Sequence, residues 1–341
     1  MLSLLIGVAV IAAATTMIVR NYQPQAVLLV SGLILLALTA IVFPDHPILY
    51  QKAKSTGWKG FDVFAFVKDS LITQMSGIGL IIMTSAAFAD YMDHLGATDA
   101  MVRFCIRPLR LVKAPYLVLA AGYVLGQCLH IAIPSAAGLA MLLLVTFFPM
   151  LVSLGVSRPA AAAMIALCSF MDLGPAVGTA NLAAKTADIP PAVYFVQYQV
   201  PVAAWVVAVV AVLILFSARY FDRRGDSSIF VSQSDASAGE QKSNDAPGLY
   251  GFLPLFPITL IVVFSPLVVD GVTVDVVTAM VLGSIAGLVC ALLVKRDVRT
   301  VFKGFQVFFN SIGSSFASVV SLLVCADVFA QGLELLGVVG Y

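Results

Sequence analysis

The sequence predicts an all-α polytopic membrane protein built from inverted repeats. Of its 341 residues, 61% are hydrophobic and 11% are charged, which lies far outside the composition of soluble globular domains. Several apolar stretches are long enough to cross a bilayer core of about 30 Å as helices. These stretches are continuous rather than alternating, which argues against membrane-spanning strands. In addition, residues 60–99 align without a gap with residues 301–340.

Ten stretches are expected to form helices, and only some of them need to cross the whole membrane. They cover residues 2–19, 26–43, about 66–95, 115–133, 135–151, 159–171, 201–218, 250–269, 276–294 and about 309–334. Glycine and proline separate several short neighbours, which indicates hairpins and interrupted helices. Such irregular backbone is tolerated at membrane depth only where protein or a water-filled cavity satisfies its polar groups.

The internal repeat is weak in sequence and is supported by the expected topology. Seven of its forty aligned pairs are identical, among them Ser70/Ser311 and Gly96/Gly337. If the N-terminus is periplasmic, most of the 19 lysines and arginines fall in segments that face the cytoplasm, as the positive-inside rule requires. The two copies then cross the membrane in opposite directions. Inverted repeats of this kind are typical of secondary transporters.

These features define the expected domain organisation. Residues 1–218 form a first transmembrane repeat, residues 219–248 a polar cytoplasmic linker rich in Ser, Asp and Gly, and residues 249–341 the start of a second, truncated repeat. The counterparts of residues 101–218 would lie beyond Tyr341. After its scaffold helices, the first repeat contains an amphipathic arm, a hairpin, a broken helix and a closing helix (97–113, 115–151, 159–190 and 201–218). The arm is expected to lie in the cytoplasmic interface of the membrane. The alternative is that it binds anionic lipid or a partner protein.

The hairpin places polar residues where the membrane should be dry. An apolar run from Pro115 breaks at Pro134-Ser135 and returns through residues 139–151, which is typical of a re-entrant hairpin with a polar tip. Ser135 is a predicted N-cap, and free backbone N–H groups at such a tip suit a carboxylate. The alternative is one proline-kinked helix. His130 is a candidate proton carrier, with a packing or hydrogen-bonding role as the alternative.

The second polar segment is the predicted break in the helix at 159–190. A helix of small residues runs into a glycine- and proline-rich segment that carries Asp172, Thr179 and Asn181. Thr and Asn are neutral ligands, and glycines let backbone carbonyls turn inward, so the segment suits a substrate carboxylate or a cation. An ionisable group at this depth is costly, which makes Asp172 a candidate coupling site for an ion or proton. The alternative is a carboxylate near the membrane face that caps a helix.

The remaining composition argues against other classes of protein. The five cysteines are scattered and never spaced C-x-x-C, so packing is favoured over redox or metal roles. The three histidines lack ligand spacing, and no hydrolase, zinc-protease or P-loop motif occurs. We therefore expect no enzyme activity, catalytic residue, cofactor or metal. No basic patch with interleaved aromatics indicates nucleic acid.

Three blocks of sequence resemble a known family. The block at 115–158, the run FADYMDHLGATDAMV at 88–102 and the run FAQGLELLGVVG at 329–340 are similar to the DcuC/DcuD carriers of C4-dicarboxylates. The resemblance implies membership of a superfamily of inverted-repeat ion transporters, in which a hairpin tip and a helix break enclose the substrate. It maps the tip to Pro134, Ser135, Ala136 and Ala137, and the break to Gly178, Thr179 and Asn181. The Ser-Asn-Thr tip of the superfamily is replaced here by Pro-Ser-Ala.

The resemblance implies secondary transport of succinate- or fumarate-type dicarboxylates across the bacterial inner membrane in anaerobic metabolism. The direction could be uptake, exchange or efflux. The expected partners are the dicarboxylate, a coupling proton or sodium ion, the lipid bilayer and a second copy in a homo-oligomer. Two alternatives stay open: a truncated, transport-inactive fragment of such a carrier, and a cation/proton antiporter of the same superfamily.

Overall fold

The computed structural model describes residues 2–42, 49, 55–112, 114–223, 247–266, 268–269 and 271–338. All regular structure in these ranges is helical, and seven helices there are long and apolar enough to cross a membrane. The prediction of an all-α polytopic membrane protein is therefore confirmed. By packing, the chain forms two compact units: Met1–Leu80 with Gly313–Tyr341, and Ile81–Ile312.

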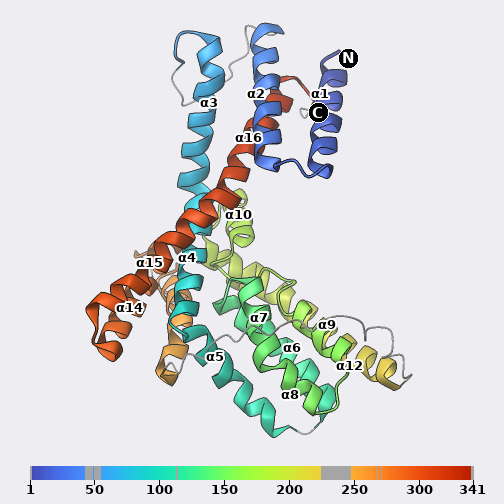
Figure 1. Ribbon diagram of the computed structural model, residues 1–341, viewed down its shortest axis with the longest axis vertical. Coiled ribbons are helices and arrows are strands. Elements are labelled where there is room, and N and C mark those ends of the chain that lie inside the picture. Colours follow the sequence, from blue (N-terminus) through green and yellow to red (C-terminus); the bar gives the residue numbers. More distant parts are fainter. Residues whose placement is uncertain are drawn as a thin grey trace. The chain divides into compact units, whose positions relative to one another are not determined.

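The first unit joins the two ends of the chain (Figure 1). Helix α2 packs against α1, α3 and α16. The π-helices η1 and η6 contact each other, and each leads directly into the next α-helix. The elements are α1 (Leu2–Val19), α2 (Pro24–Val42), α3 (Lys59–Gln74), η1 (Met75–Gly79), η6 (Phe316–Val320) and α16 (Ser321–Leu335).

Two glycines bring α2 and α16 into close contact. A Cβ on Gly32 would lie 2.8 Å from the backbone nitrogen of Phe329, and one on Gly332 would lie 2.7 Å from the Cβ of Leu35. Because real Cβ atoms do not approach so closely, only glycine allows the two backbones to meet here. Small residues serve the same purpose at many helix crossings in membranes.

The second unit holds the hairpin and the broken helix. Its first elements are α4 (Leu80–His94), α5 (Ala97–Ile106), the 3-10 helix η2 (Arg107–Leu111), α6 (Pro115–Ala132), α7 (Ala136–Thr146), α8 (Phe148–Ser153) and α9 (Arg158–Leu167). They are followed by α10 (Gly178–Thr186), α11 (Pro191–Val193), the π-helix η3 (Tyr194–Gln199) and α12 (Val200–Arg223). The series is completed by the 3-10 helix η5 (Gly248–Leu255), α13 (Phe256–Val263), α14 (Val276–Lys295) and α15 (Val298–Ser315). The last residues of α15 belong to the first unit.

Two apolar cores stabilise the second unit. One surrounds α6 and includes the fully buried Tyr123, Leu139 and Phe147. The other lies around α4 and α14 and includes Tyr91 and Met280. The first core positions the candidate site, because α6 and α9, which pack in it, both end beside the polar residues described below.

The repeated sequence adopts the same succession of elements in both copies. The π-helices at 75–79 and 316–320 lie 241 positions apart, as do the α-helices that follow them, at 80–94 and 321–335. The glycines beyond these helices, Gly96 and Gly337, both have positive φ, at 72° and 73°. A π-helix is rare, so its recurrence at one offset supports a true repeat. The inverted orientation stays a prediction.

Several element boundaries differ from the expectation. The helices expected at about 66–95 and 309–334 begin earlier, at Lys59 and Val298, because their first turns are polar and lower the hydropathy there. The return arm of the hairpin is two helices, α7 and α8, that meet at Phe147 just before Pro149. The arm expected at 97–113 is helical to Leu111. Of the linker predicted at 219–248, residues 224–246 lie outside the described residues, and α12 extends into its start.

Candidate functional site

Two helix interruptions meet in the second unit. α6 ends at Ala132 and α7 begins at Ala136, whereas α9 ends at Leu167 and α10 begins at Gly178. They meet at Gly174, where a Cβ would lie 3.3 Å from the carbonyl oxygen of Ile131. Gly174 has φ 129°, a conformation that favours glycine. The segment after α9 can therefore pass directly over the end of α6.

Ser135 caps the helix that follows the hairpin break. Its hydroxyl accepts a hydrogen bond of 3.2 Å from the backbone N–H of Gly138, and its own backbone is extended. The predicted N-cap is thus confirmed, and α6 and α7 are two separate helices around Pro134. Ala136 is exposed in the first turn of α7. The re-entrant placement of this tip in the membrane stays a prediction.

Asn181 holds the broken segment in shape. Its side-chain nitrogen donates to the carbonyl oxygens of Pro175, at 2.7 Å, and Val177, at 2.8 Å. The residue is only 3% exposed. Asn181 therefore organises the backbone that leads into α10, a role that differs from a direct contact with a ligand in the pocket.

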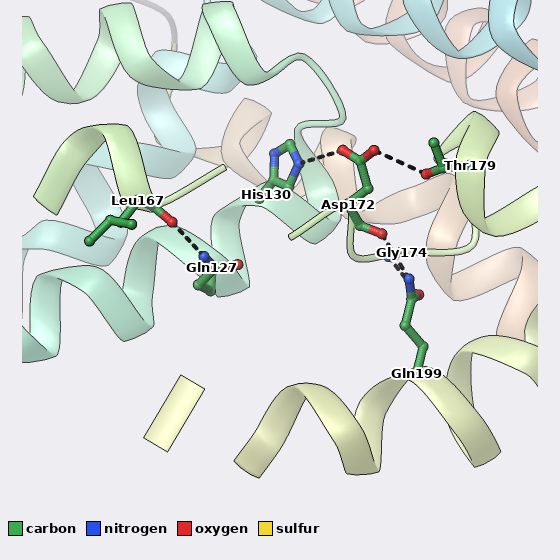
Figure 2. A network of polar contacts seen from close by, with 7 residues as sticks. All are labelled: Gln127, His130, Leu167, Asp172, Gly174, Thr179 and Gln199. Carbon is green, nitrogen blue, oxygen red and sulfur yellow. Dashed lines mark hydrogen bonds and ion pairs between the residues drawn. The ribbon is translucent and has the colours of Figure 1, made fainter. Parts of the chain in front are cut away.

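Asp172 lies at the centre of a polar network (Figure 2). One carboxylate oxygen accepts a hydrogen bond of 3.0 Å from the Thr179 hydroxyl, and the other lies 3.9 Å from Nε2 of His130. Gln199 binds the backbone of the same segment: its Nε2 donates to the Asp172 carbonyl oxygen at 2.7 Å, and its Oε1 accepts from the Gly174 N–H at 3.2 Å. The network joins the end of α6, the broken segment, α10 and η3.

A pocket of about 280 Å³ opens beside this network. The Asp172 side chain is half exposed there, whereas the His130 side chain behind it is fully buried. The lining residues are Met171, Asp172, Leu173, Thr179, Ala180, Tyr194 and Gln199. Of the site residues predicted from sequence, Asp172 and Thr179 line the pocket and His130 lies against Asp172.

The other predicted site residues do not line this pocket. Asn181 shapes the loop beneath, and Gly178 packs against α4, where a Cβ would lie 2.9 Å from a side-chain carbon of Ile82. Ser135 and Ala136 belong to the neighbouring hairpin tip. Their assignment as substrate ligands remains a prediction.

Sequence reasoning missed Gln199 and Tyr194, which come from η3. This segment precedes the expected closing helix at 201–218 and reads as an apolar continuation of it. The available signal was a pair of glutamines, Gln197 and Gln199, next to that apolar run. Within the described ranges, no group of three or more His, Cys, Asp or Glu side chains could hold a metal ion.

Comparison with known proteins identifies the kind of molecule to which this site belongs. Residues 2–341 match the family DcuC, described as a C4-dicarboxylate anaerobic carrier. The chain belongs to this family. It is 35% identical over 340 residues to the "Probable anaerobic C4-dicarboxylate transporter DcuC" of Vibrio cholerae, covering 99% of this chain and 72% of the relative. It is 33% identical over 336 residues to the "Anaerobic C4-dicarboxylate transporter DcuC" of Escherichia coli K12, covering 98% and 71%.

No solved structure matches the DcuC-family chain. Family membership and the seven candidate spans together define a multi-pass membrane transport protein embedded in a lipid bilayer. The family and its named relatives are carriers rather than enzymes.

Proposed function

We propose that the Asp172 pocket belongs to the substrate site with which this chain takes part in secondary transport of C4-dicarboxylates across the bacterial inner membrane. The observation that carries the proposal is the convergence of the two helix interruptions at Gly174, beside a pocket lined by Asp172 and Thr179. In membrane transporters, interrupted helices supply free backbone groups and helix termini to a bound substrate.

The start of α10 suits a substrate carboxylate. Its N-cap, Val177, has no side-chain acceptor, so the described residues leave the first N–H groups of this nine-residue helix available to a ligand. The helix dipole favours negative charge at the same end. Thr179 adds a hydroxyl in this first turn, and we propose that Gly178 and Thr179 bind one carboxylate. Ser135 and Ala136, at the start of α7, are the proposed second contact.

Asp172 is the proposed coupling residue, with His130 as its partner. A carboxylate beside the pocket repels a dianionic substrate, and a proton on the His130–Asp172 pair removes that net charge. Substrate and proton would then bind together, which is the basis of coupled transport. Sodium is the alternative coupling ion, since a carboxylate and a hydroxyl oxygen also suit that cation.

We further propose that the N-terminus is periplasmic and that residues 219–248 are cytoplasmic, as the distribution of lysine and arginine predicts. In the same proposal, residues 1–218 and 249–341 belong to two inverted repeats, and the protein can form a homo-oligomer.

The experiment is binding and uptake of labelled succinate by the chain reconstituted in liposomes, with a pH gradient or a sodium gradient as separate arms. Asp172→Asn should abolish the response to pH, and Thr179→Val should weaken succinate binding about tenfold, since it removes a hydrogen-bonding group from the site. Asp188→Asn is the matched control: it removes an exposed carboxylate at φ 54°, a conformation that Asn tolerates.

Unchanged coupling in the Asp172 variant would contradict the assignment of that residue. Flux that responds to sodium or pH but not to succinate would instead support a cation/proton antiporter. Absence of succinate binding by the wild-type chain would contradict the proposed substrate site.

A further inference from the structure

Three polar side chains follow one face of α6 inside the apolar core of the second unit. Tyr123, Gln127 and His130 are spaced i, i+4 and i+7, which places them on the same side of the helix. Their exposed fractions are 0%, 2% and 0%. The row spans about 10 Å along the axis, at 1.5 Å per residue. It ends at His130, beside the pocket residue Asp172.

Several polar atoms of this row have no hydrogen-bond partner among the described residues. They are the Tyr123 hydroxyl, Oε1 of Gln127 and both ring nitrogens of His130. Gln127 is fixed from its other end, because its Nε2 donates to the Leu167 carbonyl oxygen at 2.7 Å (Figure 2). The Tyr123 hydroxyl lies close enough to the Gln127 side chain to interact with it. Oε1 of Gln127 is thus an oriented acceptor next to a hydroxyl.

A row of buried polar side chains of this kind is suited to bind water. Buried polar groups are almost always paired, and unpaired ones are commonly bridged by ordered water with two to four polar partners. An oriented amide oxygen, a hydroxyl and an imidazole on one helix face supply those partners. Phe147 and Leu139 in the same core offer none.

We infer that Gln127 and Tyr123 hold water against His130, and that this water accepts the second N–H of the imidazole when the His130–Asp172 pair takes up a proton. Gln127 is then a positioning residue for the coupling site. The inference deepens the proposed function and rests on its assignment of His130 and Asp172.

The proton balance is simple. One proton enters through the pocket and binds the free ring nitrogen of His130, so the net charge of the pair changes from −1 to 0. The imidazolium directs one N–H toward the Asp172 carboxylate and donates the other to the water. That water donates in turn to Oε1 of Gln127. No other bond forms or breaks.

Asp172 is the charged group that acts on His130, and the backbone of Ile133 also lies within reach of its ring. Of the helices packed against α6, α7 and α8 carry no titratable side chain. α5 carries Asp99, Arg103 and Cys105, and η2 carries Arg107 and Arg110. α9 carries Arg158 at its first residue, and α12 carries its charged residues in its last two turns. Cys168, beyond α9, faces the Tyr123 end of the row.

The test is a pH titration of the purified chain, labelled with ¹⁵N-histidine and held in lipid nanodiscs. The chain has three histidines, so the His130 signals are assigned with His130→Gln. Gln127→Met keeps the side-chain length and removes the acceptor, and it should lower the midpoint pH of the His130 signals by about 1. Gln127→Glu keeps an acceptor and should retain or raise that midpoint. Tyr123→Phe should lower it by less than Gln127→Met.

Ser284→Ala is the matched control. Ser284 is a buried hydroxyl on another apolar helix of the same unit, where it donates to the Met280 carbonyl oxygen, and its loss should leave His130 unchanged. An unchanged midpoint in Gln127→Met, or an equal lowering in Gln127→Met and Gln127→Glu, would overturn the inference. Succinate binding is measured on the same samples, so a failure of the proposed substrate site is seen separately from the histidine titration.

Discussion

The Ser70 hydroxyl donates a hydrogen bond of 2.5 Å to the carboxylate of Asp327, 257 residues further along the chain. Ser70 on α3 is fully buried, and Asp327 lies within the candidate span that ends with α16. An acidic residue in a membrane-spanning helix needs a hydrogen-bonding partner of this kind. The pair therefore joins α3 to α16 in the first unit.

Removal of this hydrogen bond should destabilise the protein. Ser70→Ala should lower the free energy of unfolding by about 1–3 kcal/mol, because it leaves the part-buried Asp327 carboxyl without this donor. Asp327→Asn should weaken the same contact. The measurement is denaturation in detergent for both single variants and the double variant, since a double-mutant cycle isolates the pair. Ser318→Ala is the control, because that hydroxyl binds the carbonyl of Ser314, four residues earlier in the chain. Additive effects would contradict a direct coupling.

The close crossing of α2 and α16 should not tolerate a methyl group. Gly32→Ala places a Cβ 2.8 Å from backbone atoms of Val328 and Phe329, which cannot move as a flexible side chain could. We expect a loss of about 1–3 kcal/mol in the free energy of unfolding. Gly313→Ala, also in a helix, meets no atom of another described segment within 4 Å and should be neutral or stabilising. Equal stabilities of the two variants would show that the helices do not meet at Gly32.

Loss of the Asn181 amide should disorder the loop that carries Asp172. Asn181→Leu removes both hydrogen bonds to the Pro175 and Val177 carbonyls, each with a net value of about 1 kcal/mol. We expect weaker succinate binding together with faster hydrogen exchange in residues 172–178. Thr186→Val serves as the control, because its exposed hydroxyl binds only the Leu182 carbonyl of its own helix. Normal binding in Asn181→Leu would contradict this organising role.

Acid should loosen the start of α15. Hydrogen bonds from Thr300, and a weaker one from the Arg299 N–H, hold the pKa of the exposed Asp297 carboxyl below its ordinary value of 3.8. A group whose pKa is lower in the folded state contributes stability above its unfolded pKa and loses it as the pH falls through the folded pKa. The protection of the first α15 amides, measured against their intrinsic exchange rate at each pH, should therefore fall below about pH 4. In Asp297→Ala that protection should be low at every pH. The same pH response in this variant would assign it to another group.

The helical elements could be predicted from sequence because a bilayer core offers no water to backbone N–H and C=O groups. An apolar segment that crosses it must therefore satisfy these groups internally, as a helix does. The hairpin break at Pro134 and the interruption after residue 167 follow from local chemistry, since proline lacks an N–H and glycine permits unusual φ. The repeat at 60–99 and 301–340 was visible as seven identities, and the two π-helices at one offset now support it.

Gln199, Gln127 and Asp327 could not be selected in the same way. Each is a polar residue within an apolar run, and its partner lies far away in sequence or in another helix. A hydropathy pattern records the cost of a buried polar group but not the atom that satisfies it. The boundary at Phe147 was also missed, because periodicity cannot distinguish one apolar helix from two.

By itself, the sequence determined the class of protein, the order of its helices, the two interruptions and the resemblance to the carrier family. These properties depend on composition and on short-range backbone chemistry. Only the tertiary structure decided that Asp172 lies between His130 and Thr179, and that Gly174 passes over the end of α6. Distances between segments forty or more residues apart depend on how side chains pack, and for that reason the pocket emerges only when the chain is folded.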